Sequence, residues 1–127
     1  MGVKDVKNMK IQSYENLIVW QKSMDLVALV YKLTVTFPRE ELYGLVSQMR
    51  RSAISIPSNI AEGSRRGTKK DFRQFIIIAF GSGAELETQI KIAKRLKYSD
   101  DTYYQTIDQL LEEAMRMLNA LSKQLHV

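Results

Sequence analysis

The sequence is most constrained by its apolar side chains, which recur at alternating steps of three and four residues along almost the whole chain after residue 14. This spacing places side chains on one face of an α-helix, whereas a half-buried β-strand alternates with a period of two. The last segment has the cleanest repeat, which consists of Tyr104, Ile107, Leu111, Ala114, Leu118, Leu121 and Leu125. Two prolines and six glycines are too few turn-formers for a protein of many short strands. The sequence therefore predicts an all-α fold.

Three short breaks divide this pattern into four helical segments. The first break is Phe37-Pro38, because the residue before a proline is pushed out of the α region. The second break covers residues 63–67 and contains two glycines, and the third covers residues 97–101. Such short connections force neighbouring helices to run antiparallel, so residues 15–127 are expected to form one up-down-up-down four-helix bundle. Residues 1–14 are expected to be a basic, poorly ordered leader.

Two features inside these segments are unusual for helices. Pro57 lies within the second segment, where we expect a kink rather than a break because the apolar period continues in phase across it. Gly81 and Gly83 weaken the third segment by up to about 1 kcal/mol each relative to alanine. Both glycines therefore indicate close backbone packing nearby.

The chain carries more apolar surface than one bundle core needs. Two neighbouring stripes follow the first segment: Leu17, Trp20, Met24, Val27, Tyr31 and Thr34 form one, and Val19, Ser23, Leu26, Val30, Leu33 and Phe37 form the other. We interpret the second stripe as surplus, together with residues 75–80, which are apolar on all sides. Large exposed apolar patches are unusual on soluble monomers, so the sequence predicts a homo-oligomer.

Composition excludes several kinds of functional site. Cysteine is absent and the single histidine, His126, is the second-last residue, so neither a thiolate or histidine metal centre nor a histidine-based triad can be built. No Glu-x-x-His pair is present for a di-iron site. The longest apolar runs are far shorter than a membrane span, and no secretory signal is recognisable. We therefore expect a cytoplasmic protein without metal, cofactor or catalytic residues.

The second segment carries a polar stripe at helical spacing, which consists of Gln48, Ser52, Ser55, Asn59, Glu62 and Arg66. Serine and asparagine are poor helix formers and are tolerated within helices when their side chains have fixed partners. Ser82, Glu85 and Gln89 offer such partners on the third segment. We expect a hydrogen-bonded seam in which Arg50 or Arg51 pairs with Glu85 or Glu87. A catalytic serine is the alternative, but no general base accompanies it.

The densest basic cluster consists of Arg65, Arg66, Lys69, Lys70 and Arg73, at the second break and the start of the third segment. Only Asp71 opposes these cations, and the free backbone amides of a helix start also favour anions. The cluster can therefore engage phosphates, and the net charge of +5 fits a nucleic-acid partner. A solvated basic loop is the alternative interpretation, and both stay open on the residues alone.

Four stretches match the pattern of a known family. They are residues 19–27, Phe37-Pro38 with Tyr43-Gly-Leu45, residues 47–63 from Ser-Gln-Met-Arg-Arg to Asn-Ile-Ala-Glu-Gly, and Gly81-Ser82 with Glu85-Leu-Glu-Thr-Gln89. With them the chain resembles the bacterial four-helix-bundle proteins encoded in intervening sequences of 23S ribosomal RNA genes, most densely over residues 15–98. That family is similar to the accessory protein of diversity-generating retroelements, which binds a reverse transcriptase and nucleic acid.

The resemblance implies a ring-like homopentamer with a basic surface and no enzymatic activity. The residues that match the family motif are Arg50, Arg51, Asn59, Glu62, Gly63, Glu85 and Glu87, of which the last five are assigned to structure and assembly. We therefore expect a pentamer that binds structured RNA or DNA through the basic cluster, with Arg50 and Arg51 as further contacts. The alternative is a protein-interaction scaffold, or an accessory subunit of a nucleic-acid enzyme such as a reverse transcriptase, that does not bind nucleic acid itself.

Overall fold

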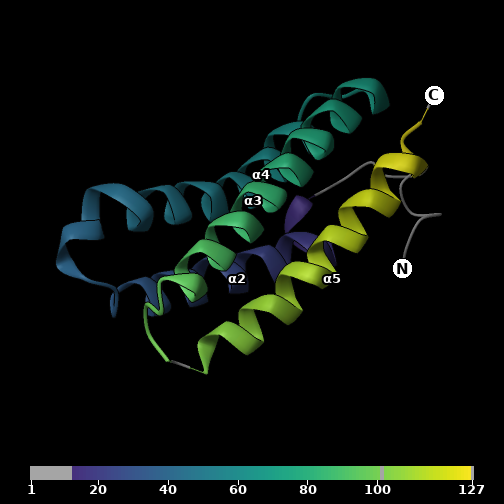
Figure 1. The fold of residues 1–127 in the computed structure, drawn as a ribbon. Coiled ribbons are helices and arrows are strands. Elements are labelled where there is room, and N and C mark those ends of the chain that lie inside the picture. Colours follow the sequence, from purple (N-terminus) through teal and green to yellow (C-terminus); the bar gives the residue numbers. More distant parts are fainter. Residues whose placement is uncertain (1–12, 101, 127) are drawn as a thin grey trace.

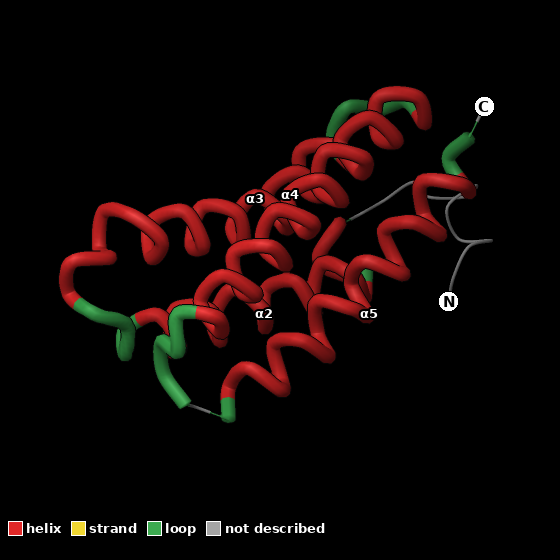
Figure 2. The backbone as a smooth tube through the Cα atoms, in the orientation of Figure 1, coloured by secondary structure: helices red, strands yellow, loops and turns green. Residues whose placement is uncertain are grey.

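The structure is a computed structural model that describes residues 13–100 and 102–126, and every regular element in these ranges is helical (Figure 2). Four long helices make up most of it: α2 (Ile18–Thr34), α3 (Ser47–Ser64), α4 (Lys69–Arg95) and α5 (Tyr103–Gln124) (Figure 1). Three shorter elements are the 3-10 helices η1 (Tyr14–Asn16) and η2 (Arg39–Glu41) and the π-helical η3 (Leu42–Val46). The expected leader lies outside the described residues except for its last two positions. Of these, Ser13 caps η1 and Tyr14 belongs to it.

The long helices follow one another around a square. Helix α2 packs against α3 and α5, and α4 packs against the same two neighbours, so each helix contacts the next one in the chain. Consecutive helices run in opposite directions, as the ribbon shows (Figure 1). The predicted antiparallel four-helix bundle is therefore confirmed.

The core is built from one apolar stripe per helix, and for α2 we had assigned the wrong stripe. The stripe from Val19 to Phe37 that we interpreted as surplus is the buried one, and Leu26, Val30 and Leu33 are completely inaccessible. The neighbouring stripe leaves Met24 43% and Tyr31 37% exposed. The buried stripe is the one that faces α3 and α5, while Tyr31 and Trp20 of the neighbouring stripe keep a polar end accessible.

The second segment begins less regularly than predicted, but it does not break at its proline. Helix α3 continues through Pro57 as a single helix, since Ile56 and Ile60 on either side stay fully buried in the core. The departure from helical geometry lies earlier, at Gly44 in η3 (φ −113°, ψ −110°). The long helix therefore starts at Ser47 rather than directly after Pro38.

Helices α3 and α4 approach each other closely because small residues line their contact. A Cβ added to Gly63 would lie 2.6 Å from the Cβ of Phe75 and 3.0 Å from Cδ1 of Phe72. Gly83 faces α5, where an added Cβ would overlap Sδ of Met115, the flexible end of a side chain that can move. Gly83 therefore packs closely on a side chain rather than on a backbone, and a Cβ at Gly81 would meet no described atom within 4 Å.

A cluster of tyrosines fastens the connection between α4 and α5 to η2. The hydroxyl of Tyr98 donates to Oε2 of Glu41 at 2.7 Å, and its ring packs on Phe37. The hydroxyl of Tyr104 donates to the backbone carbonyl of Tyr98 at 2.6 Å. The Tyr98 hydrogen bond, helped by a bond from the backbone amide of Leu45, holds the pKa of Glu41 below its ordinary value.

No helix in the described part of the chain is both long and apolar enough to cross a membrane.

Candidate nucleic-acid interface

The polar stripe on α3 faces α4, as the sequence predicts. The hydroxyls of Ser55 and Ser82 lie 2.7 Å apart, and the Asn59 amide donates to Oγ of Ser55 at 2.9 Å. Gln89 is buried at the same helix pair, and its Oε1 has no hydrogen-bond partner among the described residues. The Ser55–Ser82 hydrogen bond therefore joins the two helices, and Asn59 supports it from within α3.

Arg50 does not pair with Glu85 or Glu87, so that prediction is wrong. Its Nε donates to Oγ1 of Thr34 at 3.0 Å, and its guanidinium lies 4.4 Å from the centre of the Tyr31 ring. Both partners belong to α2, on the other side of α3 from α4. Arg50 therefore fastens α3 to α2, and this half-buried side chain is largely occupied by contacts within its own chain.

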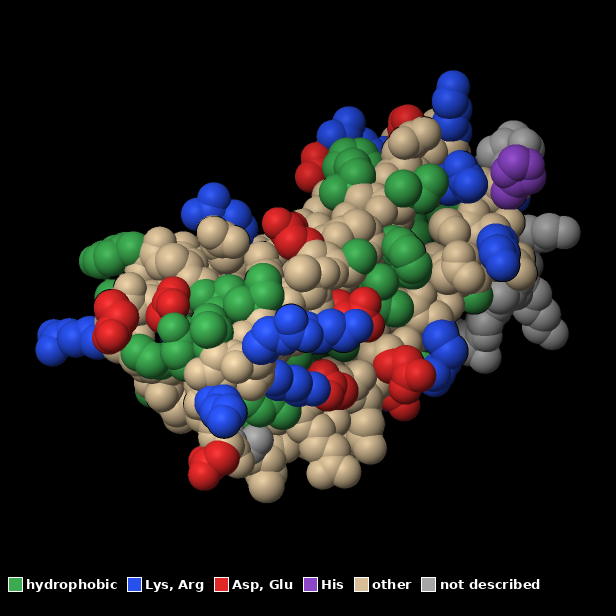
Figure 3. All heavy atoms as spheres, in the orientation of Figure 1, with side chains coloured by type: hydrophobic (Ala, Val, Ile, Leu, Met, Phe, Trp, Pro, Cys, Tyr) green, Lys and Arg blue, Asp and Glu red, His purple; other side chains and the backbone are tan. Residues whose placement is uncertain are grey.

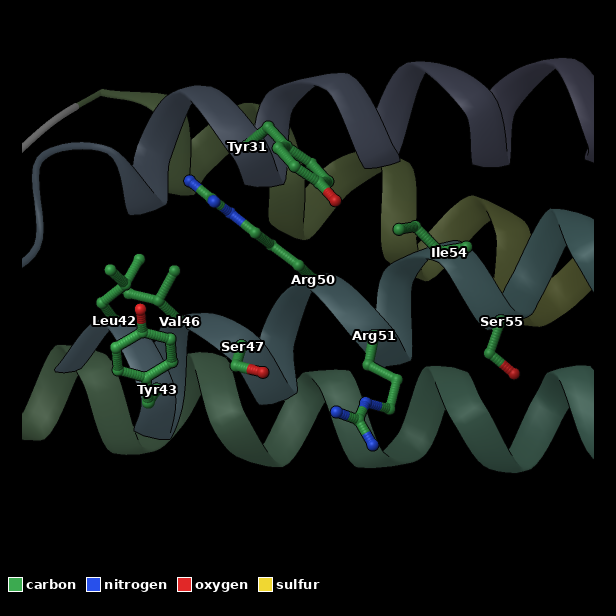
Figure 4. A pocket seen from close by; sticks show the side chains of 9 residues that line it. All are labelled: Tyr31, Leu42, Tyr43, Val46, Ser47, Arg50, Arg51, Ile54 and Ser55. Atoms are coloured by element: carbon green, nitrogen blue, oxygen red, sulfur yellow. The ribbon is translucent and has the colours of Figure 1, made fainter.

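Arg51, Glu85 and Glu87 are exposed, and none of them forms an ion pair with another described residue. Arg51 turns toward α4, whereas Arg50 turns toward α2, as the close view shows (Figure 4). Between these directions lies a shallow groove of about 610 Å³ over α3, η3 and the side of α2. Tyr43 at its edge is 92% exposed.

The basic cluster lies at the end of the bundle where α3 ends and α4 begins, and its five members differ in accessibility. Lys69 and Lys70 are exposed in the first turn of α4 and form no ion pair with a described residue. Arg65 is exposed too, with its guanidinium 5.5 Å from the centre of the Tyr14 ring. Arg66 is held by Glu62, at 2.7 Å between Nη2 and Oε2. This ion pair assigns Glu62 a local role at the end of α3.

Arg73 does not belong to the accessible cluster. It is half-buried, and its Nε donates to the backbone carbonyl of Ser122 at 3.0 Å. This bond joins α4 to the last turn of α5, where a helix presents unpaired carbonyl groups that a cation satisfies. The same contact brings the exposed Lys123 to this end of the bundle, a position that we had not included. The position of Lys123 in the sequence of α5 does not indicate that it lies near the basic cluster, because only the packing of α5 on α4 brings it to that end of the bundle.

The basic cluster presents three accessible cations to solvent. Arg65, Lys69 and Lys70 face solvent together at a helix start, where the free backbone amides also favour anions. Lysines in the first turn of a helix oppose the helix dipole, so their charge contributes little to the stability of α4. Within residues 13–100 and 102–126, no three acidic or histidine side chains gather where they could hold a metal ion.

Comparison with known proteins agrees with this architecture. The model of the family described as 23S rRNA-intervening sequence protein matches residues 15–120. The chain is also similar to a crystal structure from Bacteroides thetaiotaomicron, described as a protein with unknown function from the S23 ribosomal protein family. The two share 25% sequence identity with a TM-score of 0.74, over 84% of this chain and 99% of the other. None of the curated proteins compared with the chain matches it. The chain belongs to the 23S rRNA-intervening sequence protein family.

Proposed function

We propose that the protein is a non-catalytic homo-oligomer, with five subunits as the family resemblance implies, that binds structured RNA or DNA through the basic end of each bundle. The observation that carries the proposal is the exposure of Arg65, Lys69 and Lys70 beside one another at the α3–α4 turn. Phosphates are the partners that such a group recognises, and each contact is individually weak in salt. Repetition around an oligomer adds these contacts together.

The test is equilibrium binding of the full chain to fluorescent hairpin RNA and duplex DNA across a salt series. If two subunits each engage three phosphates, the logarithm of the association constant for duplex DNA should fall with the logarithm of the salt concentration at a slope of about −5. Wild-type protein without salt-dependent binding would contradict the proposal and favour the alternative, a protein-interaction scaffold.

A matched pair of variants locates the surface. Reversing the three basic-end charges with Arg65→Glu, Lys69→Glu and Lys70→Glu should abolish binding at moderate salt, while the oligomer persists. The control reverses three exposed lysines nearer the other end, Lys32, Lys91 and Lys97, and so carries the same net charge. Equal loss in both variants would mean that net charge alone, rather than the basic end, governs binding.

A further inference from the structure

The outward side of α4 exposes a regular stripe that no described residue covers. Ile78, Gly81, Glu85, Thr88 and Ile92 follow one another at steps of three, four, three and four, and all five are exposed. We call these residues the outer stripe. Ile78 is 50% and Ile92 45% exposed. The neighbouring Ile77 and Leu96 are 41% and 51% exposed. Figure 3 shows apolar side chains at the surface among charged ones on the face it draws. So many exposed apolar side chains on one helix are unusual for a monomeric protein.

Gly81 gives the outer stripe a second distinctive feature. Glycine within a helix costs about 1 kcal/mol relative to alanine, and its usual justification is the close approach of another backbone. Gly63 and Gly83 have close contacts within the chain, since an added Cβ would overlap Cβ of Phe75 or the side-chain end of Met115. Gly81 has none among the described residues, because a Cβ there meets no atom within 4 Å. A second copy of the chain can supply a close approach at Gly81.

The outward side of α3 offers a surface of opposite character. Ser47, Arg51, Ile54 and Ser58 follow it at steps of four, three and four, so a serine stands on either side of an arginine and an isoleucine. The first three line the groove of about 610 Å³, which we call the α3 groove (Figure 4). No described residue that lines this groove is acidic, and Arg51 brings a positive charge that is not neutralised by an ion pair.

We propose that the outer stripe of one copy packs into the α3 groove of a second copy, with Glu85 paired to Arg51 across the interface. This inference rests on the proposed oligomer and deepens it by naming the two surfaces. The charges are complementary, the isoleucines find apolar cover, and Gly81 lets the helices come close. The pairing that we expected within one chain is thereby formed between chains.

The geometry also selects the kind of assembly. The two surfaces are different patches on neighbouring corners of the bundle, so the contact is heterologous rather than two-fold. Heterologous contacts build rings when the rotation between subunits closes and filaments when it does not. The proposed pentamer is the closed case, a ring.

The test is native mass spectrometry and size-exclusion chromatography of full-length charge variants at low micromolar concentration. Arg51→Glu or Glu85→Arg alone should weaken assembly at least about tenfold, because like charges then meet at the interface. In an equimolar mixture every contact between the two different variants restores opposite charges, so oligomers containing both variants should form. A ring of five subunits keeps one like-charged contact and should therefore be weaker than the wild-type ring. The double variant should assemble as well.

The mixture distinguishes pairing between chains from pairing within one chain. Rescue by the double variant, together with a mixture that forms no oligomer containing both variants, would place the ion pair within a chain and overturn the proposal. So would single variants that assemble as wild type does. A wild-type chain found only at 14.7 kDa would overturn both this interface and the proposed oligomer. Lost nucleic-acid binding by an intact oligomer would affect the proposed function alone.

A steric variant tests the glycine independently. Gly81→Gln places a helix-favouring side chain in open space, so the single bundle should keep its helical circular dichroism while the oligomer dissociates. Ala120→Gln, on the exposed side of α5, is the matched control and should leave both unchanged. An oligomer that tolerates Gly81→Gln as well as Ala120→Gln would remove the outer stripe from the interface.

Discussion

The close contact between α3 and α4 depends on one glycine, and replacing it with alanine should destabilise the bundle even though alanine is the better helix former. In Gly63→Ala the new Cβ would lie 2.6 Å from the Cβ of Phe75 and 3.3 Å from the backbone carbonyl oxygen of Phe72. The Phe75 contact is to an atom that cannot rotate away, so the helices themselves have to separate. Ordinary carbon–carbon contacts are about 3.5–4.0 Å, which requires a displacement of roughly 1 Å.

The two opposing contributions can be compared in size. Overpacking a filled core costs typically about 1–3 kcal/mol, while the helix propensity gained by replacing glycine is at most about 1 kcal/mol. The net loss of stability is up to about 2 kcal/mol, and because a 2.6 Å contact is severe we expect the upper half of this range, a fall in Tm of about 3–8 °C for a domain of this size. Thermal unfolding followed by circular dichroism, together with urea unfolding followed by the fluorescence of Trp20, measures it.

Ala120→Gly is the matched control, because it removes a methyl group from an exposed position in the last part of α5. It should lose up to about 1 kcal/mol through propensity alone. If close packing governs Gly63, both variants are destabilised although one gains a methyl group and the other loses it. A Gly63→Ala protein as stable as wild type, or more stable, would refute the steric argument.

Two further predictions concern polar groups. Gln89→Leu should raise the free energy of unfolding by about 1 kcal/mol in urea unfolding, because it removes a buried carbonyl oxygen without a partner; a destabilised variant would show that this amide has a partner. Tyr98→Phe should lower stability at pH 7, because it removes the hydrogen bond that lowers the pKa of Glu41. A carboxyl with a lowered pKa stabilises the fold above its ordinary value of 4.5 and loses that contribution as pH falls through the lowered pKa. The difference from wild type should therefore shrink below that range in unfolding curves recorded across pH, and a difference that stays constant would exclude Glu41 as its cause.

The sequence alone determined the four helices, their antiparallel order and the core stripe of α5. These properties follow from local periodicity and from connections too short to permit another arrangement. The polar seam was also predictable, because Ser55 and Asn59 within a helix require fixed partners.

Only the tertiary structure decided how each helix is rotated and which residues its side chains reach. Two stripes on α2 have the same period, so periodicity could not choose between them, and the packing of α2 against α3 and α5 did so. The guanidinium of Arg50 lies over the ring of Tyr31, and Arg73 donates a hydrogen bond to the backbone carbonyl of Ser122, far along the chain. These partners depend on the register between helices, which is set by the way their side chains interlock. The local sequence pattern does not specify that register.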